Sequence, residues 1–198
     1  QFVEGDVQHW WLPDTGAGVR TLISDDVVWL GHAIHRYIGA TGDKAILDEP
    51  LAFLTGDALK PGHADSFFKP VESDEKASLY EHAARALDLA IIRTGENGLP
   101  LMLGGDWNDG MNRVGIGGKG TSVWLGWFLA ATLRDFVAYA DARGDKARSD
   151  AWSKHVEALK KALETAGWDG AYYRRGTFDN GSPLGSVQSD ECQIDSLG

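Results

Sequence analysis

The sequence predicts an all-α fold, and three observations lead to this prediction. Four segments carry apolar residues at the three- and four-residue spacing of a helix. Strand-like patterns are scarce, and the clearest candidate is a possible hairpin turn at Asn180-Gly181. The helices are joined by long, glycine-rich loops, and long loops in a compact domain are usually functional. We therefore expect long helices that carry functional loops.

Two helices are expected in the first half of the chain. Ser24 stands where an N-cap would, the two acids behind it complement the helix dipole, and apolar residues follow at helical spacing. Gly42 is expected to close this helix, because glycine readily adopts the left-handed conformation of a C-cap. A turn-rich linker, residues 54–75, follows it. The second helix is expected over residues 75–93.

Two further helices are expected in the second half. Residues 122–143 have apolar positions nearly all round the predicted helix, which indicates burial on several sides. Residues 147–167 carry an apolar stripe that includes Trp152 and Leu159, opposite a face of lysines and glutamate. This last helix is therefore predicted to be amphipathic.

Composition restricts the class of partner. The chain has 198 residues, a formal net charge of -10 and a pI near 4.9, so it lacks the positive charge that nucleic-acid binding needs. No apolar run approaches the roughly 20 residues that cross a bilayer, and no signal peptide opens the sequence. Cys192 is the single cysteine, which excludes an internal disulfide and favours a reducing compartment. Eight tryptophans are compatible with core packing or with stacking on sugar rings.

The segment GLPLMLGGDWNDGMNRVG, residues 98–115, concentrates chemically active side chains in a glycine-rich loop. An EF-hand is excluded, because Met111 stands at the glycine position and Gly117 at the position of the last glutamate. A purely structural turn explains the Asp, Asn and Gly residues, but it does not explain an indole at the tip. Carbohydrate chemistry explains both, because an acid beside an indole can stay protonated and donate a proton to a glycosidic oxygen. In that case Trp107 would form the wall of a sugar pocket.

A second candidate cluster precedes the first expected helix. Arg20 lies a few residues before Asp25 and Asp26, and together they could clamp sugar hydroxyls. The alternative is that both acids only complement the helix dipole. His9, with Trp10 and Trp11, could form a stacking shelf or an interface plug.

Other motifs give no support to other classes of enzyme. The sequence contains no HExxH, paired CxxC or GxGxxG motif, so neither a zinc hydrolase nor a dinucleotide-binding enzyme is indicated, and we expect no metal. The GIGGKGTS run lacks the spacing of a phosphate-binding loop. His82, among alanines of an expected helix, is interpreted as a packing residue.

Seven segments in order resemble the glycoside hydrolase family 94 regions of cyclic β-1,2-glucan synthases. They are QHWW, GVRTLISDD, YEHAARALD, GLPLMLGGDWNDGMNRVG, SVWLGWFL, WDGAYYRRGTFDNGSPLGS and ECQIDS. The family also contains cellobiose, chitobiose and β-1,2-oligoglucan phosphorylases. The resemblance implies an (α/α)6 toroid with its active site at the loop end. Residues 1–198 would then be an incomplete catalytic domain of this family, truncated at both ends.

The resemblance also implies roles for individual residues. Asp109 matches the general acid, Trp107 matches the indole of the donor-sugar subsite, and Arg20 matches part of the sugar clamp. Asp106 is expected to organise the loop or to bind a sugar hydroxyl. The full set of expected substrate-binding residues is Arg20, Asp25, Asp26, Trp107, Asp106, Asn108, Trp10 and Trp11.

Two features depart from this pattern or lie outside it. The family usually has glutamate where this chain has Thr121. Its phosphate-binding histidine and threonine would fall beyond Gly198, so no counterpart can be named in this sequence. Whether Asp25 or Asp26 takes part in the sugar clamp stays open.

The implied reaction is inverting phosphorolysis of β-1,2-glucan. Asp109 would protonate the leaving glucosyl oxygen while inorganic phosphate, the co-substrate, attacks the anomeric carbon and releases α-glucose 1-phosphate. Phosphate is already a competent anion, so neither a catalytic base nor a cofactor is expected. The expected role is control of glucan chain length within a cyclic β-1,2-glucan synthase.

The expected partners are a β-linked glucan, phosphate, and glycosyltransferase and membrane segments upstream in the parent chain. This chain would be a cytoplasmic domain of an inner-membrane protein. Three alternatives remain: a free-standing β-1,2-oligoglucan or cellobiose-type phosphorylase, a hydrolase that uses water, and a non-catalytic glucan-binding module. A hydrolase would need a second carboxylate about 6.5 to 9.5 Å from the acid.

Overall fold

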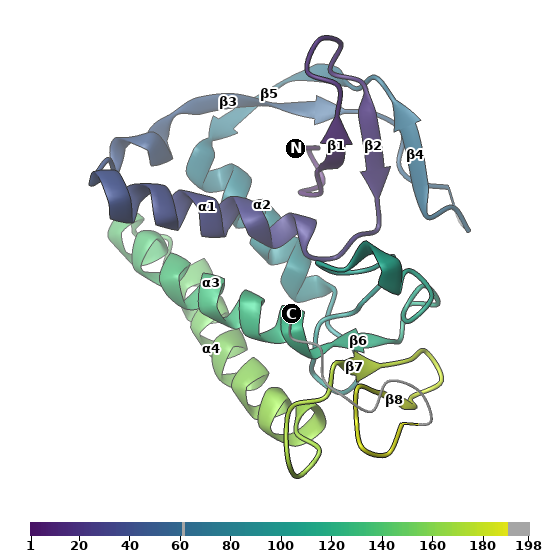
Figure 1. Ribbon diagram of the computed structural model, residues 1–198. Coiled ribbons are helices and arrows are strands. Elements are labelled where there is room, and N and C mark those ends of the chain that lie inside the picture. Colours follow the sequence, from purple (N-terminus) through teal and green to yellow (C-terminus); the bar gives the residue numbers. More distant parts are fainter. Residues whose placement is uncertain (61, 190–198) are drawn as a thin grey trace.

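The fold combines four long helices with three small antiparallel sheets. A computed structural model describes residues 1–60 and 62–189 (Figure 1). The all-α prediction is therefore wrong, because strands occupy much of the first half of the chain and the region after α4. The segment ECQIDS, with Cys192, lies outside the described residues.

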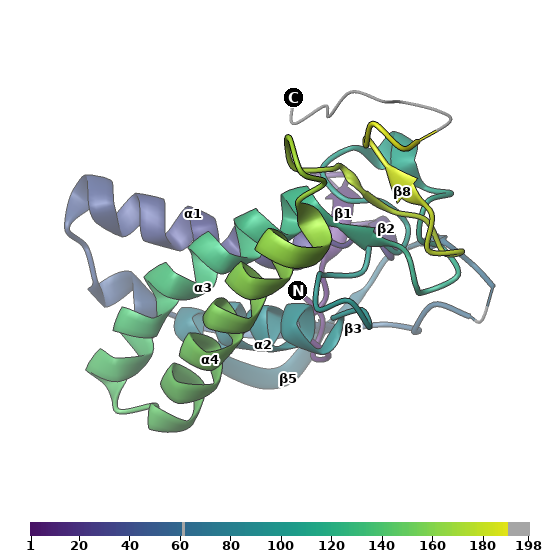
Figure 2. The same ribbon diagram turned by 90° about the horizontal axis from the view of Figure 1, so that it is seen from below.

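The four long helices pack together on one side of the molecule. Figures 1 and 2 both show α3 and α4 running side by side. Short 3-10 turns, η1 and η2, and a terminal π-turn, η3, supplement them. The bounds are α1 (Asp26–Thr41), α2 (Leu79–Ile92), α3 (Val123–Arg143), α4 (Lys146–Ala162), η1 (Ala45–Asp48), η2 (Asp109–Met111) and η3 (Leu163–Gly167).

Most helix ends agree with the predicted signals. Ser122 caps α3 by accepting a hydrogen bond from the Leu125 amide, and Gly42 ends α1 with a φ of 74°. Ser24 is not the N-cap of α1, contrary to the prediction. Its hydroxyl donates instead to the Gly105 carbonyl at 2.9 Å, so it links α1 to a distant loop.

The strands form three separate antiparallel sheets. One has the order β1-β2-β4, the second pairs β3 with β5, and the third has the order β6-β7-β8. The bounds are β1 (Gln8–Trp11), β2 (Gly18–Thr21), β3 (Pro50–Thr55), β4 (Asp65–Phe68), β5 (Val71–Ser78), β6 (Thr121–Ser122), β7 (Gly176–Thr177) and β8 (Pro183–Leu184).

These strands correct the expected linker and confirm the expected hairpin. The segment predicted as a linker contains β4 and most of β5, and α2 begins only after β5 ends. The strand VESDEKAS is mostly polar and exposed, so its sequence shows no clear alternation, and its hydrogen bonds come from pairing with β3. The hairpin predicted at Asn180-Gly181 is confirmed by the pairing of β7 with β8, and Gly181 has a φ of 82°.

One apolar cluster fills the space between the four helices. Its fully buried members include Leu87 of α2, Leu129 and Phe136 of α3, and Trp152 of α4. Burying each such side chain contributes about 1.5–3 kcal/mol. His82 of α2 is a packing residue, because its ring stacks on Phe53 of β3 with centroids 3.8 Å apart. Within the described part, none of the helices combines the length and apolarity needed to cross a membrane.

Arg148 of α4 joins α2 to α4 through a charged network. Its guanidinium donates to Glu81 at 2.5 Å and to Asp88 at 2.8 Å, and it is 24% exposed. Asp88 also accepts a hydrogen bond from the Trp152 indole at 2.8 Å. Hydrogen bonds to these two carboxylates raise the pKa of Arg148, so it stays charged.

We expect Arg148→Ala to lower the free energy of unfolding by about 1–3 kcal/mol, because Asp88 loses its cation and Glu81 keeps only its ion pair with Arg85. Urea unfolding measures the change. Lys160→Ala on the exposed face of α4 is the control, since its ion pair with Glu157 should contribute under about 0.5 kcal/mol. Equal losses in the two variants would contradict the structural role of the network.

Candidate active site

The loop that contains Asp106 to Asp109 is held against the connection between β2 and α1 (Figure 1). The Gly104 amide donates to the Leu22 carbonyl at 3.0 Å, and the Ser24 amide donates to the Gly105 carbonyl at 2.8 Å. Leu103 enters the loop with a φ of 51°, which is uncommon for a residue other than glycine. Gly105 follows with a φ of 136°, a region open mainly to glycine. The glycine-rich sequence thus allows a backbone turn that most residues would resist.

Asp106 anchors this loop from inside the protein. Its side chain is 0% exposed and accepts hydrogen bonds from Arg175 Nη2 and from Ser122 Oγ, each at 2.5 Å. The Asn108 amide donates to the same carboxylate at 3.1 Å. Arg175 is itself almost fully buried, so the ion pair joins the loop to β7 and to the start of α3. Both carboxylate oxygens of Asp106 contact the protein, and a role for it in substrate binding stays a prediction.

The tip of the loop is exposed. Trp107 is 56% exposed, and its ring centroid lies 6.5 Å from that of Trp124 on α3. From Trp124 the ring contacts continue to Phe128 at 5.3 Å and from there to Trp29 of α1 at 4.6 Å. The Asn108 side chain accepts a hydrogen bond from the Gly110 amide and so shapes the turn. Trp107 therefore contacts Trp124 and still leaves more than half of its surface exposed, and stacking on a sugar ring needs such an exposed indole.

His9 contacts the predicted acid, which sequence analysis missed. Its Nε2 lies 3.3 Å from Oδ2 of Asp109, whose side chain is 64% exposed. Its Nδ1 lies 3.1 Å from each carboxylate oxygen of Asp26. The imidazole thus bridges the two acids. The signal available in the sequence was the histidine in QHWW, but the spacing to both acids is not visible without the strand pairing.

The adjacent acids Asp25 and Asp26 have different surroundings. Asp26 faces His9 and also accepts a hydrogen bond from the Thr21 hydroxyl at 3.4 Å. Asp25 is 3% exposed and accepts a hydrogen bond from the Trp29 indole at 2.7 Å. Burial raises the pKa of Asp25 to about 6, and the charges of Asp26 and Asp106 add to this effect. Burial also raises the pKa of Asp26, although His9 opposes the shift. Of the two adjacent acids, it is Asp26 whose partner, His9, also contacts Asp109.

Arg20 is directed toward the N-terminal segment. Its Nε and Nη2 donate to the two carboxylate oxygens of Asp6 at 2.6 and 2.7 Å, and Nη2 also lies 3.2 Å from Glu4. Its guanidinium stacks on Phe2, 4.0 Å from the ring centroid. The side chain is 4% exposed. The structure therefore shows Arg20 in a structural ion pair, and its contact with a sugar stays a prediction.

Trp10 and Trp11 project from the β1–β2 hairpin. They are 47% and 57% exposed, and the ring of Trp10 lies 5.7 Å from the ring of Phe67 on β4, which is also exposed. Their exposure is compatible with both interpretations, a stacking shelf and an interface plug.

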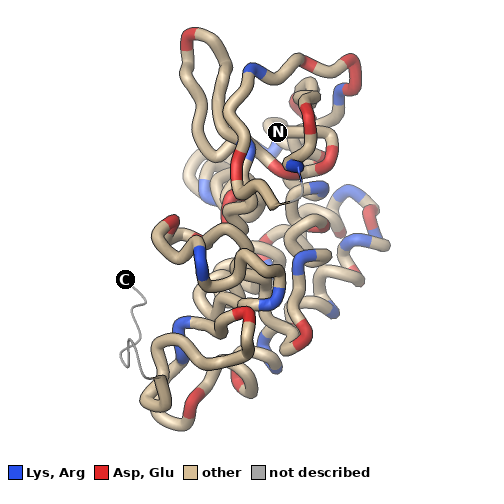
Figure 3. Tube along the Cα trace, turned by 90° about the vertical axis from the view of Figure 1, so that its right-hand side faces the viewer, with Lys and Arg blue, Asp and Glu red and all other residues tan. Residues whose placement is uncertain are grey.

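Figure 3 shows acidic and basic residues interspersed along the described trace.

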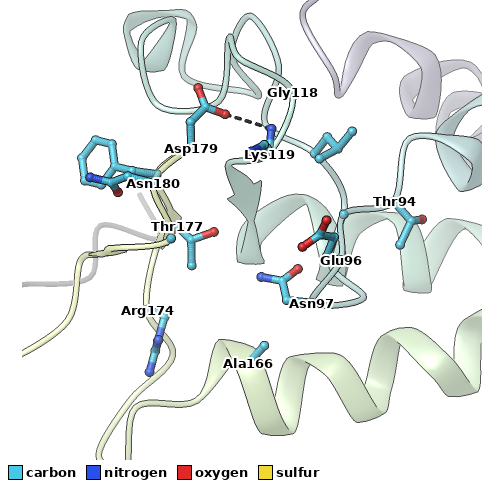
Figure 4. Close-up of a pocket in the computed structure, with 14 residues that line it drawn as sticks. Thr94, Glu96, Asn97, Gly118, Lys119, Ala166, Arg174, Thr177, Asp179 and Asn180 are labelled. Atoms are coloured by element: carbon cyan, nitrogen blue, oxygen red, sulfur yellow. Dashed lines mark hydrogen bonds between the residues drawn. The ribbon is translucent and has the colours of Figure 1, made fainter.

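A separate cavity of about 560 Å³ lies between the residues after α2 and the β7–β8 hairpin (Figure 4). Asp179 shapes its rim by accepting hydrogen bonds from the amides of Gly117, Lys119 and Gly120. Burial alone would raise the pKa of Asp179, but the hydrogen bonds from these amides outweigh burial, so the pKa is lowered. Thr121, which replaces the expected glutamate, is buried beside this cavity and bonds the Thr177 hydroxyl at 2.8 Å. In the described residues, no three acidic, histidine or cysteine side chains meet in a metal-binding arrangement.

The chain matches one protein-family profile and is similar to several known proteins. The profile of the glycosyl hydrolase 94 superfamily, catalytic domain, matches residues 1–198. The chain is similar to the cyclic beta-(1,2)-glucan synthase NdvB of Rhizobium meliloti (strain 1021), with 67% identity over 100% of this chain and 7% of that protein. It is also similar to two proteins of Paenibacillus borealis. The solabiose phosphorylase is 30% identical over 98% of this chain, and the 3-O-beta-D-glucopyranosyl-beta-D-glucuronide phosphorylase is 29% identical over 96%. The chain spans only 22% and 23% of these two phosphorylases.

Removal of the buried cation should destabilise the loop strongly. We expect Arg175→Met to lower the free energy of unfolding by about 3–5 kcal/mol, because the Asp106 carboxylate is then buried without a partner. The matched control is Arg174→Met, since Arg174 Nε has no hydrogen-bond partner among the described residues. Urea unfolding distinguishes the two, and a loss for Arg175→Met no larger than the control would contradict the anchoring role.

Asp25 should make stability depend on pH. Because its pKa rises from 3.8 to about 6 on folding, the folded state binds more protons than the unfolded state between these values, and stability falls as pH rises through this range. Asp25→Asn keeps an acceptor for Trp29, so it should raise the free energy of unfolding by about 1–3 kcal/mol above pH ~6. The gain should vanish below pH ~4.

Urea unfolding at a series of pH values tests this expectation. Asp14→Asn, in the exposed β1–β2 turn, is the control and should leave the pH dependence unchanged. A stabilisation by Asp25→Asn that grows as the pH falls would show that the sign is wrong.

Proposed function

The chain belongs to the glycosyl hydrolase 94 superfamily, and from this premise we propose that it is part of the phosphorylase-like region of a cyclic β-1,2-glucan synthase. The 67% identity to such a synthase extends over the whole chain, whereas identity to the two Paenibacillus phosphorylases is 29–30%. The chain covers 7% of the synthase's length, so the activity of the complete protein is part of the proposal.

The proposed reaction is inverting phosphorolysis of a β-1,2-glucan chain. Asp109 donates a proton to the leaving glucosyl oxygen as inorganic phosphate bonds to the anomeric carbon, and α-glucose 1-phosphate is released. The observation that carries this proposal is the exposed Asp109 carboxyl on a loop whose base is fixed by the buried Asp106–Arg175 pair. An acid in this position can meet a glycosidic oxygen without losing its orientation, which favours proton transfer.

Neighbouring side chains supply the proposed sugar contacts. Trp107 offers an exposed indole face beside the acid, and Asp26 lies across His9 from Asp109. Asn108, Asp25, Trp10 and Trp11 complete the proposed binding region, and Arg20 would first have to exchange its contacts with Asp6. The proposed setting is the cytoplasmic side of an inner membrane, next to glycosyltransferase and membrane segments of the same protein. Inorganic phosphate is the co-substrate, and no cofactor is required.

A free-standing phosphorylase is the second candidate. It is favoured by the two Paenibacillus proteins, whose names describe phosphorylases and to which most of this chain aligns. The two candidates share the reaction and differ in the acceptor sugar and in what precedes this region in the parent protein.

The decisive experiment follows glucose 1-phosphate release from linear β-1,2-glucooligosaccharides by the complete parent protein, with and without added phosphate. We expect phosphate-dependent release that Asp109→Asn reduces by about 100-fold or more, because the variant cannot donate the proton. Asp150→Asn on the exposed face of α4 is the matched control and should retain full activity.

The other outcomes have distinct meanings. Glucose released without phosphate would identify a hydrolase instead of a phosphorylase. Oligosaccharide binding without turnover would identify a glucan-binding module. Full activity of Asp109→Asn would remove Asp109 from the role of acid.

A further inference from the structure

His9 occupies an irregular position in the β1–β2 pair. Gln8 lies opposite Arg20, and the next paired residue, Trp10, lies opposite Val19. His9 is therefore the extra residue of a β-bulge, with no partner of its own on β2. A bulge changes the direction of a side chain relative to the regular alternation of a strand, and bulges recur beside active sites.

The bulged side chain reaches two acids from different elements. Nδ1 contacts both oxygens of Asp26, in the first turn of α1, and Nε2 contacts one oxygen of Asp109, at the start of η2. Asp26 is the least exposed member of this row, with a side chain 15% exposed, and Asp109 is the most exposed, at 64%. His9 lies between them at 25%. Solvent exposure therefore increases along the row toward the acid of the candidate site.

The geometry points to His9 as a positioning residue that holds the Asp109 carboxyl and stabilises the carboxylate formed when Asp109 gives up its proton. This inference rests on the proposed role of Asp109 as the acid. With both ring nitrogens protonated, Nδ1–H donates to Asp26 and Nε2–H donates to Oδ2 of Asp109. Oδ1 of Asp109 then carries the proton that is transferred.

The proton transfer balances with His9 unchanged. The proton leaves Oδ1 of Asp109 for the glucosyl oxygen as the glycosidic bond breaks, and its bonding pair stays on Asp109. Phosphate supplies the electron pair for the new bond to carbon. His9 keeps both of its protons, and its positive charge faces the negative charge that develops on Asp109 in the transition state. Solvent later returns a proton to Asp109.

The charges around His9 favour the doubly protonated ring. Burial lowers its pKa, but hydrogen bonds and charges from Asp26 on α1 and Asp109 on η2 outweigh burial, so the pKa of His9 is raised. The half-buried Arg93 adds one positive charge that interacts with Asp6 and Asp26. Since the pKa of His9 is raised, the imidazolium persists to higher pH than in an isolated histidine and is lost as pH rises through that value.

The first test compares steady-state kinetics of His9→Gln with those of the unmodified protein, in the complete parent protein. Glutamine can keep one hydrogen bond but carries no charge. We expect kcat to fall by about 10- to 100-fold with KM changed less than about threefold, and the alkaline limb of the pH profile to move. His63→Gln, in the exposed segment between β3 and β4, is the matched control and should change neither.

The second test needs neither turnover nor replacement of His9. NMR titration of the His9 imidazole in the absence of substrate should give a lower pKa in Asp109→Asn than in the unmodified protein, because a neutral amide replaces the ionised Asp109 carboxylate that faces the ring before Asp109 takes up the proton it donates. An unchanged His9 titration would overturn the inference. So would normal kinetics of folded His9→Gln, or an effect confined to KM.

Failure of the inference can be told apart from failure of the proposed function. If Asp109→Asn loses activity and His9→Gln keeps it, the positioning role is wrong and the acid role stands. If Asp109→Asn keeps full activity, the proposed acid role is wrong, and the inference that depends on it falls with it.

Discussion

The ion pair between Asp106 and Arg175 is the constraint on which the candidate site depends. It places a carboxylate with no solvent exposure against an almost fully buried guanidinium, and Ser122 completes the bonding of the acid. Such a pair tolerates little displacement, because separation leaves an uncompensated charge inside the protein. The loop on one side and the start of α3 on the other are therefore fixed relative to each other. The position of the exposed side chains at the tip of the loop, Trp107 and Asp109, therefore depends on this ion pair.

Two acids three positions apart consequently have opposite characters. Asp106 is enclosed and satisfied by protein donors, whereas Asp109 is open to solvent and touches one histidine. Gly105, with a φ of 136°, turns the backbone directly before Asp106, and Asn108 shapes the turn at Asp109 by accepting a hydrogen bond from the Gly110 amide. A rigid base with an accessible tip is what proton transfer to a bound sugar requires. In a regular helix, residues three positions apart lie on nearly the same face. Asp106 could then not have been buried while Asp109 stayed exposed.

The sequence revealed the helices and the candidate residue types better than it revealed their contacts. The helices were predictable because apolar period and C-terminal glycines are local signals, as Gly42 at the end of α1 shows. The strands of residues 65–78 were missed because their side chains are largely polar and exposed, so that pairing, not patterning, defines them. The contact of His9 was missed for a related reason, since the bulge exists only once β1 and β2 are paired. Arg175 was not foreseen because 69 positions separate it from Asp106.

The β7–β8 hairpin has a consequence for the order in which the molecule can assemble. Arg175, just before β7, completes the Asp106 loop, and Asp179, in its turn, gathers the amides of the glycine-rich segment before α3. Both segments leave the ribosome well before the residues that secure them. During synthesis, α1 and α2 can pack early, but the loop of Asp106 to Asp109 has to wait for the hairpin. A nascent chain arrested before residue 175 would therefore present a folded scaffold with its proposed chemistry still unassembled.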